Sequence, residues 1–96
     1  MREVFLVKSE DKSMVEDMLR RDDEIGRGSI TVRSAASLDI EEDGYFIIID
    51  ASHERVEKAK HLIAEFAHIY KHARKVLDKI DEQENSAIEG FGNILG

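Results

Sequence analysis

The sequence predicts a two-layer α+β domain of order βαββα, in which two helices cover one face of a short sheet. Three features lead to this prediction: short apolar runs at 3–8 and 45–49, alternating apolar and polar residues over 30–40, and a helical repeat over 53–82. At 96 residues the chain has the size of one domain. We assign residues 1–83 to this domain and residues 84–96, which contain three glycines, to a flexible C-terminal tail.

The first strand is expected at residues 3–8, an apolar run bounded by charged residues. A helix should follow, because Ser13 and Glu16 have the spacing of a capping box. Its apolar face is formed by Met14, Val15, Met18 and Leu19. The helix should end near Asp22, after two arginines that suit the negative end of the helix dipole.

Residues 30–40 alternate between apolar and polar side chains, which predicts a second strand with one face towards the core. Asp43-Gly44 is a strong hairpin signal, and the apolar run 45–49 after it predicts the third strand. Ser52 is suited to cap the next helix. Apolar residues then recur at spacings of three and four, so we expect one long helix over 53–82, with a stripe formed by Val56, Ala59, Ile63, Phe66, Tyr70, Ala73, Leu77 and Ile80.

This order of elements favours a sheet of order 1-3-2 with both helices on one face, a ferredoxin-like arrangement without its last strand. Two apolar surfaces then remain uncovered, because the first strand is an apolar edge and the long helix outruns the sheet. We therefore predict a homodimer, or association with another protein, through Ala73, Val76, Leu77 and Ile80. The alternative is intramolecular, with the tail or the first helix covering these surfaces.

Charge and composition exclude several classes of function. The net charge is −7 and no basic stripe with interleaved aromatic residues offsets it, so nucleic acid is disfavoured as a partner. The absence of cysteine excludes disulfides and thiolate metal sites. No apolar run could span a membrane and no signal-peptide pattern is found, so we expect a cytoplasmic protein. The carboxylates fall in a turn and at a helix end, so we expect neither an enzyme nor a cofactor.

Three histidines and a glutamate share one face of the expected long helix: His61, Glu65, His68 and His72. His68 and His72 stand four residues apart, a spacing that lets two imidazoles bind one metal ion, with Glu65 as an oxygen ligand. The alternative, which we favour, is a solvated helix face, because no carboxylate is placed to orient the imidazoles.

Three segments resemble a KH RNA-binding domain: Ile25-Gly26-Arg27-Gly28-Ser29, Leu38-Asp39-Ile40-Glu41-Glu42-Asp43-Gly44 and Val56-Glu57-Lys58-Ala59-Lys60-His61-Leu62-Ile63. They are similar to the glycine loop, the hairpin ending in Asp-Gly and the Glu-Lys-Ala helix of that family. The resemblance implies binding of single-stranded RNA, with contacts from Arg27 and Arg33.

The order of elements over residues 3–80 resembles the small dimerising subunit of the archaeal KEOPS tRNA-modification complex. The resemblance includes Ser9-Glu10-Asp11 after the first strand and Asp50-Ala51-Ser52 before the long helix. It implies a non-catalytic module that dimerises within a larger assembly. Such a module is our first functional hypothesis, and a degenerate KH-like RNA binder is the alternative. The tail is a further docking candidate through Ile88, Phe91, Ile94 and Leu95.

Overall fold

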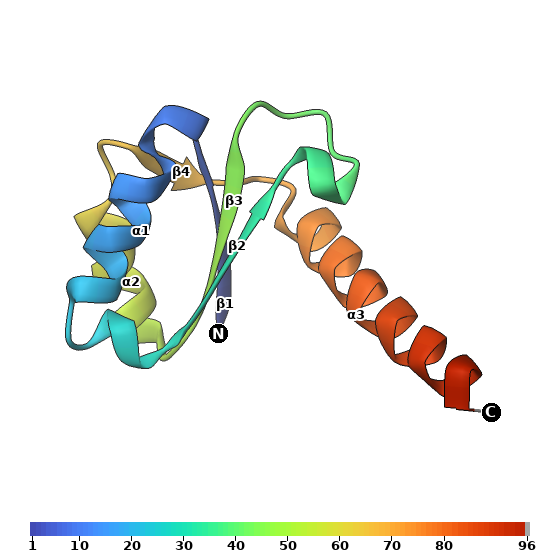
Figure 1. The fold of residues 1–96 in the computed structure, drawn as a ribbon. Helices are drawn as coiled ribbons and strands as arrows, with labels where there is room; N and C mark the ends of the chain where they lie inside the picture. The colour runs from blue at the N-terminus through green and yellow to red at the C-terminus, as the bar shows by residue number, and fades with distance from the viewer. Residues whose placement is uncertain (96) are drawn as a thin grey trace.

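A four-stranded antiparallel sheet forms the middle layer of the computed structural model, and helices cover both of its faces (Figure 1). The structure describes residues 1–95, with side chains for residues 1–84. Its strands and longer helices are, in chain order, β1 (Arg2–Val7), α1 (Lys12–Arg21), β2 (Ser29–Ser34), β3 (Tyr45–Asp50), α2 (His53–Leu62), β4 (Ala67–Ile69) and α3 (Ala73–Leu95). The connections hold the short 3-10 helices η1 (Ser9–Asp11), η2 (Ile25–Arg27) and η3 (Ala36–Leu38).

The strand order is β2-β3-β1-β4. The prediction of three strands in the order 1-3-2 is wrong in its strand count, although β1, β3 and β2 are neighbours as expected. The added strand, β4, pairs with residues 5–7 of β1. With β4 in place, the chain up to Ile69 has the complete β-α-β-β-α-β order of a ferredoxin-like fold, so the predicted lack of a last strand is also wrong.

The single helix predicted over residues 53–82 is wrong, because α2 ends at Leu62, β4 follows, and α3 begins at Ala73. The spacing of apolar residues in this stretch fits a helix, but Phe66, Ile69 and Tyr70 are also good strand residues. Tertiary pairing decides between the two, because the apolar edge of β1 gains a hydrogen-bonded neighbour from this segment. The N–H of Tyr70 donates to the carbonyl of Val4 at 2.9 Å and extends that pairing past the end of β4.

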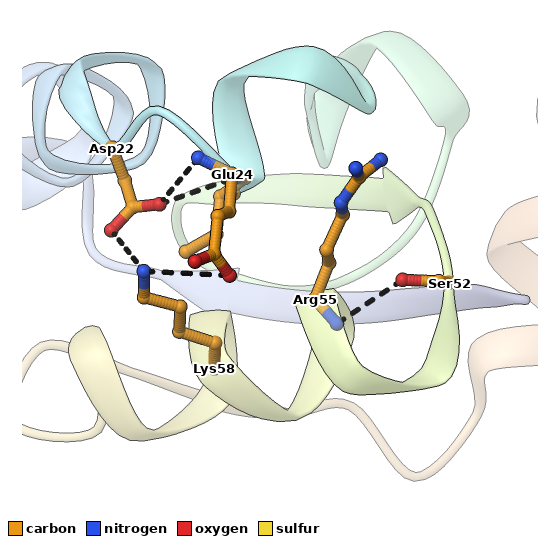
Figure 2. Close-up of polar contacts among 6 residues, drawn as sticks. Asp22, Glu24, Ser52, Arg55 and Lys58 are labelled. Carbon is orange, nitrogen blue, oxygen red and sulfur yellow. Dashed lines mark hydrogen bonds and ion pairs between the residues drawn. The ribbon is translucent and has the colours of Figure 1, made fainter.

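Helices α1 and α2 pack side by side on one face of the sheet (Figure 1). The apolar cluster beneath them consists of Phe5, Val7, Val15, Leu19, Ile25, Ile47, Ile49, Val56, Ala59, Ile63 and Ala67. Ser52 caps α2 as predicted, since its hydroxyl accepts a hydrogen bond from the N–H of Arg55 at 3.4 Å (Figure 2). The capping box predicted at Ser13 is wrong, because α1 begins at Lys12, so that Ser13 lies inside its first turn, and no side chain caps the helix.

Helix α3 and the short helix η3 cover the opposite face of the sheet, so the molecule has three layers and not the predicted two (Figure 1). The apolar cluster between them consists of Val4, Ala35, Leu38, Ile40, Phe46, Ile48, Tyr70, Val76 and Ile80. Residues of β1 and of β3 therefore alternate between two apolar cores, which explains why both strands are apolar on both sides.

The second strand is shorter than the alternation over residues 30–40 predicts. β2 ends at Ser34, where the hydroxyl of Ser37 donates to the carbonyl of Ser34 at 2.7 Å and starts the turn into η3. Leu38 and Ile40 then fill the space under α3 in place of strand positions. β2 and β3 pair as the predicted hairpin, but residues 35–44 connect them in place of a tight turn at Asp43-Gly44. Gly44, at the end of this connection, has a positive φ of 115°.

Candidate functional site

The four residues predicted to form an interface lie on the half of α3 that contacts the sheet. Val76 and Ile80 are buried in the chain's own core, and Ala73 and Leu77 are partly buried beside them. The premise of that prediction, that residues 73–80 have nothing of their own to cover them, is wrong. Association of the chain remains a prediction, and it needs another surface.

The last contacts between α3 and the rest of the chain, among the residues with described side chains, involve residues 81–84. The guanidinium of Arg2 lies 3.5 Å from the carboxylate of Asp81, and the amide of Gln83 donates to the carbonyl of Ser37 at 2.7 Å. Glu84 lines a small hollow of about 140 Å³ between α3 and the ends of β2 and β3. These polar contacts fix the direction in which α3 leaves the sheet.

Beyond Glu84 the helix continues through Leu95, where the sequence predicted a tail. Figure 1 shows this part of α3 running away from the sheet, with the C-terminus far from the other elements. Its backbone extends for about 17 Å at 1.5 Å per residue. The apolar residues of this stretch recur at helical spacing in the sequence: Ala87, Ile88, Phe91, Ile94 and Leu95. We call residues 85–95 the distal α3 segment.

The shared face of the three histidines and Glu65, considered above as a metal site or as a solvated surface, depended on one continuous helix, and that helix is absent. His61 lies on α2, His68 on β4, and His72 in the turn before α3, where its ring packs 5.8 Å from that of Tyr70. Glu65 lies in the connection between α2 and β4. Among the residues whose side chains are described, no three histidine, aspartate or glutamate side chains are grouped closely enough to hold a metal ion.

The two arginines predicted to contact RNA lie at the start and near the end of the β2 segment. Arg27 is exposed at the end of η2, and Gly28 leads directly into β2 without an intervening helix. Arg33 lies on β2, and its Nη1 donates to the carbonyl of Val32 at 3.0 Å. The glycine loop leads into β2, an edge strand of the sheet, and RNA binding at this loop stays a prediction.

A polar group between α1 and α2, missed by sequence reasoning, fixes the loop before β2. One carboxylate oxygen of Asp22 accepts hydrogen bonds from the N–H groups of Glu24 and Ile25, both at 3.0 Å. Its other oxygen lies 3.1 Å from the ammonium of Lys58 on α2, which also approaches Glu24 at 3.7 Å (Figure 2). The bond from Ile25 and the charge of Lys58 lower the pKa of Asp22, and the Asp22 carboxylate raises the pKa of Lys58.

The outer edge of β2 is the second feature that sequence reasoning missed. The predicted order 1-3-2 already placed this strand at an edge, but which of its backbone groups face outwards follows only from the pairing register with β3. The edge, the distal α3 segment and the two arginines are the candidate functional features of this chain.

Comparison with models of known families, with curated proteins and with solved structures finds no match for this chain. Within the described residues, no helix combines the length and the apolar character that crossing a membrane requires. The functional argument therefore depends on the surfaces described above.

Proposed function

We propose that this chain is a non-catalytic interaction module that pairs with a second copy through the distal α3 segment and serves as a subunit of a larger complex. The role is the one that the resemblance to a small dimerising subunit implies, but with a different contact surface. Residues 73–80 are used inside the chain, and residues 85–95 take their place as the associating part of the same helix.

The observation that carries the proposal is that α3 continues to Leu95, beyond residues 81–84, where its last described contacts with the rest of the chain lie. Most helical stability in proteins comes from packing of an apolar face, and each interior glycine costs roughly 1 kcal/mol relative to alanine. The distal segment has 11 residues, from 85 to 95, and contains Gly90 and Gly92. A helix of this composition requires packing against another surface to be stable.

A second copy provides that surface with the fewest assumptions. The apolar positions recur at spacings of three and four from Ala87 to Leu95, the pattern by which two helices pack along a shared seam. A two-fold pairing places the same positions of both helices at the seam and closes the assembly at two chains.

The experiment compares the solution masses of the complete chain and a chain ending at Glu84, by sedimentation equilibrium. The complete chain should have about twice its monomer mass of 10.9 kDa, and the shortened chain should be a folded monomer. A monomeric complete chain at every concentration, or a dimer that persists after shortening, would contradict the proposal.

A matched pair of variants separates apolar packing from a change of charge. Replacing Ile88 and Phe91 by aspartate should abolish the dimer, because both are apolar positions of the repeat. Replacing Asn85 and Asn93 by aspartate adds the same charge at polar positions and should leave the dimer in place. Equal loss in both variants would mean that charge, and not the apolar seam, determines the mass.

A further inference from the structure

The register between β2 and β3 determines which backbone groups of β2 face outwards. The N–H of Ala35 donates to the carbonyl of Gly44 at 3.0 Å, and this pair continues the register Ser34–Tyr45. Because bonded and non-bonded pairs alternate in an antiparallel ladder, Ser29, Thr31 and Arg33 bond to β3. The N–H and C=O groups of Ile30, Val32 and Ser34 therefore point away from the sheet.

The outward carbonyls and the outward N–H groups of this edge differ in how they are satisfied. Arg33 Nη1 donates to the carbonyl of Val32 at 3.0 Å, and the hydroxyl of Ser37 donates to that of Ser34 at 2.7 Å. Within the described part of the chain, no acceptor bonds to the outward N–H groups of Ile30, Val32 and Ser34. The edge therefore offers a row of three donors.

β2 lacks most of the features that protect an edge strand from pairing. Such strands are commonly short, bulged or interrupted by proline or lysine. β2 runs for six residues, pairs with β3 in continuous register and contains neither proline nor lysine. Arg33 is the one charged residue within it. The opposite edge, β4, has only three residues and so offers a much shorter row.

The two faces beside this edge differ in chemistry. Ile30 and Val32 pack against the core under α1 and α2 but remain partly exposed, so an added strand meets apolar side chains on that side. Arg33 lies on the α3 side, where it provides a positive charge near the Ser34 end. The Ser29 end of the same side carries charges of both signs, because Arg2 lines the hollow there together with Asp50 and Asp81 and lies 3.5 Å from Asp81.

The geometry points to β2 as a site that binds an extended peptide segment of a different protein by strand addition, an inference that goes beyond the proposed function. The segment carries apolar residues at alternate positions, towards Ile30 and Val32, and a carboxylate beside Arg33. The occupant is not a second copy, because β2 contains no acidic residue that could lie beside Arg33 of another β2. This edge thereby gives the dimer a way to bind the rest of its complex.

The test uses the complete, ¹⁵N-labelled chain and the peptide acetyl-Thr-Val-Thr-Val-Glu-Val-Thr-amide, followed by NMR. Binding should shift the amide signals of Ile30, Val32 and Ser34 most. It should be about threefold tighter than for the peptide with lysine in place of glutamate, as expected for an exposed ion pair. Arg33→Glu should invert this preference. Unchanged β2 amides at millimolar peptide, or equal binding of both peptides, would overturn the proposal.

A proline at an outward position provides the control for the backbone. Val32→Pro removes an N–H that faces away from β3, so the sheet should remain while peptide binding falls at least tenfold. Val32→Ala keeps the N–H and only shortens a side chain that meets the peptide, so it should weaken binding much less than the proline does. Should Val32→Pro fail to fold, the charge inversion at Arg33 tests the site without it. Single-stranded RNA that shifts the same amides more strongly than the peptide would assign the edge to RNA and overturn the proposal.

The readout distinguishes this inference from the proposed function. A chain ending at Glu84 keeps β2 and should bind the peptide as a monomer. A 96-residue chain that is monomeric but binds the peptide would refute only the role of the distal α3 segment, and a dimeric chain that does not bind the peptide would refute only the role of the β2 edge.

Discussion

At the scale of single residues, Asp22 accepts two hydrogen bonds from the N–H groups of the connection after α1 and pairs with Lys58 of α2 (Figure 2). Its folded-state pKa lies below the usual value, first because of the hydrogen bond from Ile25 and then because of Lys58. A carboxylate whose pKa is lowered on folding stabilises the fold above the unfolded pKa of about 4. This contribution is lost as pH falls through the folded value.

Replacing Asp22 by alanine should therefore lower the melting temperature at pH 7 by about 5 °C. The difference from the unchanged chain should shrink at acidic pH, as the pH falls through the lowered pKa of Asp22. Asp23→Ala is the control, because that neighbouring side chain is exposed. A loss as large at pH 2 as at pH 7, measured by circular dichroism, would show that the charge of Asp22 contributes nothing.

Gly44 is required by backbone geometry. Its φ is 115°, and a Cβ at this position would collide with the carbonyl oxygen of Val7. Gly44→Ala should lower the free energy of unfolding by about 2 kcal/mol or more, measured by urea denaturation. Asp43→Ala, a change at the exposed neighbour, should shift it by less than about 0.5 kcal/mol. Equal effects of the two would mean that the turn adapts to a side chain at residue 44.

At the scale of elements, the sequence pattern predicts correctly those strands and caps that depend only on neighbouring residues. The apolar runs at 3–8 and 45–49 form β1 and β3, and Ser52 caps α2. The segment from Ile63 to His72 could not be assigned in this way, because its apolar spacing fits a helix and its aromatic residues fit a strand. The choice is made by the unpaired edge of β1, which is distant in the sequence.

The docking of α3 on its own sheet can be tested at Val76, which has no exposed surface. Val76→Asp places a carboxylate in the core and should destabilise the monomer by more than about 3 kcal/mol. Lys75→Asp, at the exposed neighbour, should have little effect. Were residues 73–80 an interface between chains, Val76→Asp would instead give a stable folded monomer, which differential scanning calorimetry together with the solution mass would reveal.

At the scale of the whole molecule, the sequence showed correctly that two apolar surfaces need cover, but the prediction of what covers them was wrong. The edge of β1 and the stripe from Ala73 to Ile80 both need cover, and the chain provides it through β4 and through α3 on the second face. The pattern could not reveal this, because a helix that turns back and a helix that continues have the same apolar spacing. The candidate interface on α3 is accordingly residues 85–95 and not residues 73–80.

The most direct measurement is amide hydrogen exchange along α3 as a function of protein concentration. Packing within the chain predicts that the amides of residues 76–80 are protected at every concentration. Pairing of two copies predicts that residues 86–95 gain protection only where the dimer forms. Fast exchange of the distal segment at every concentration, or protection of residues 76–80 that vanishes on dilution, would contradict this account.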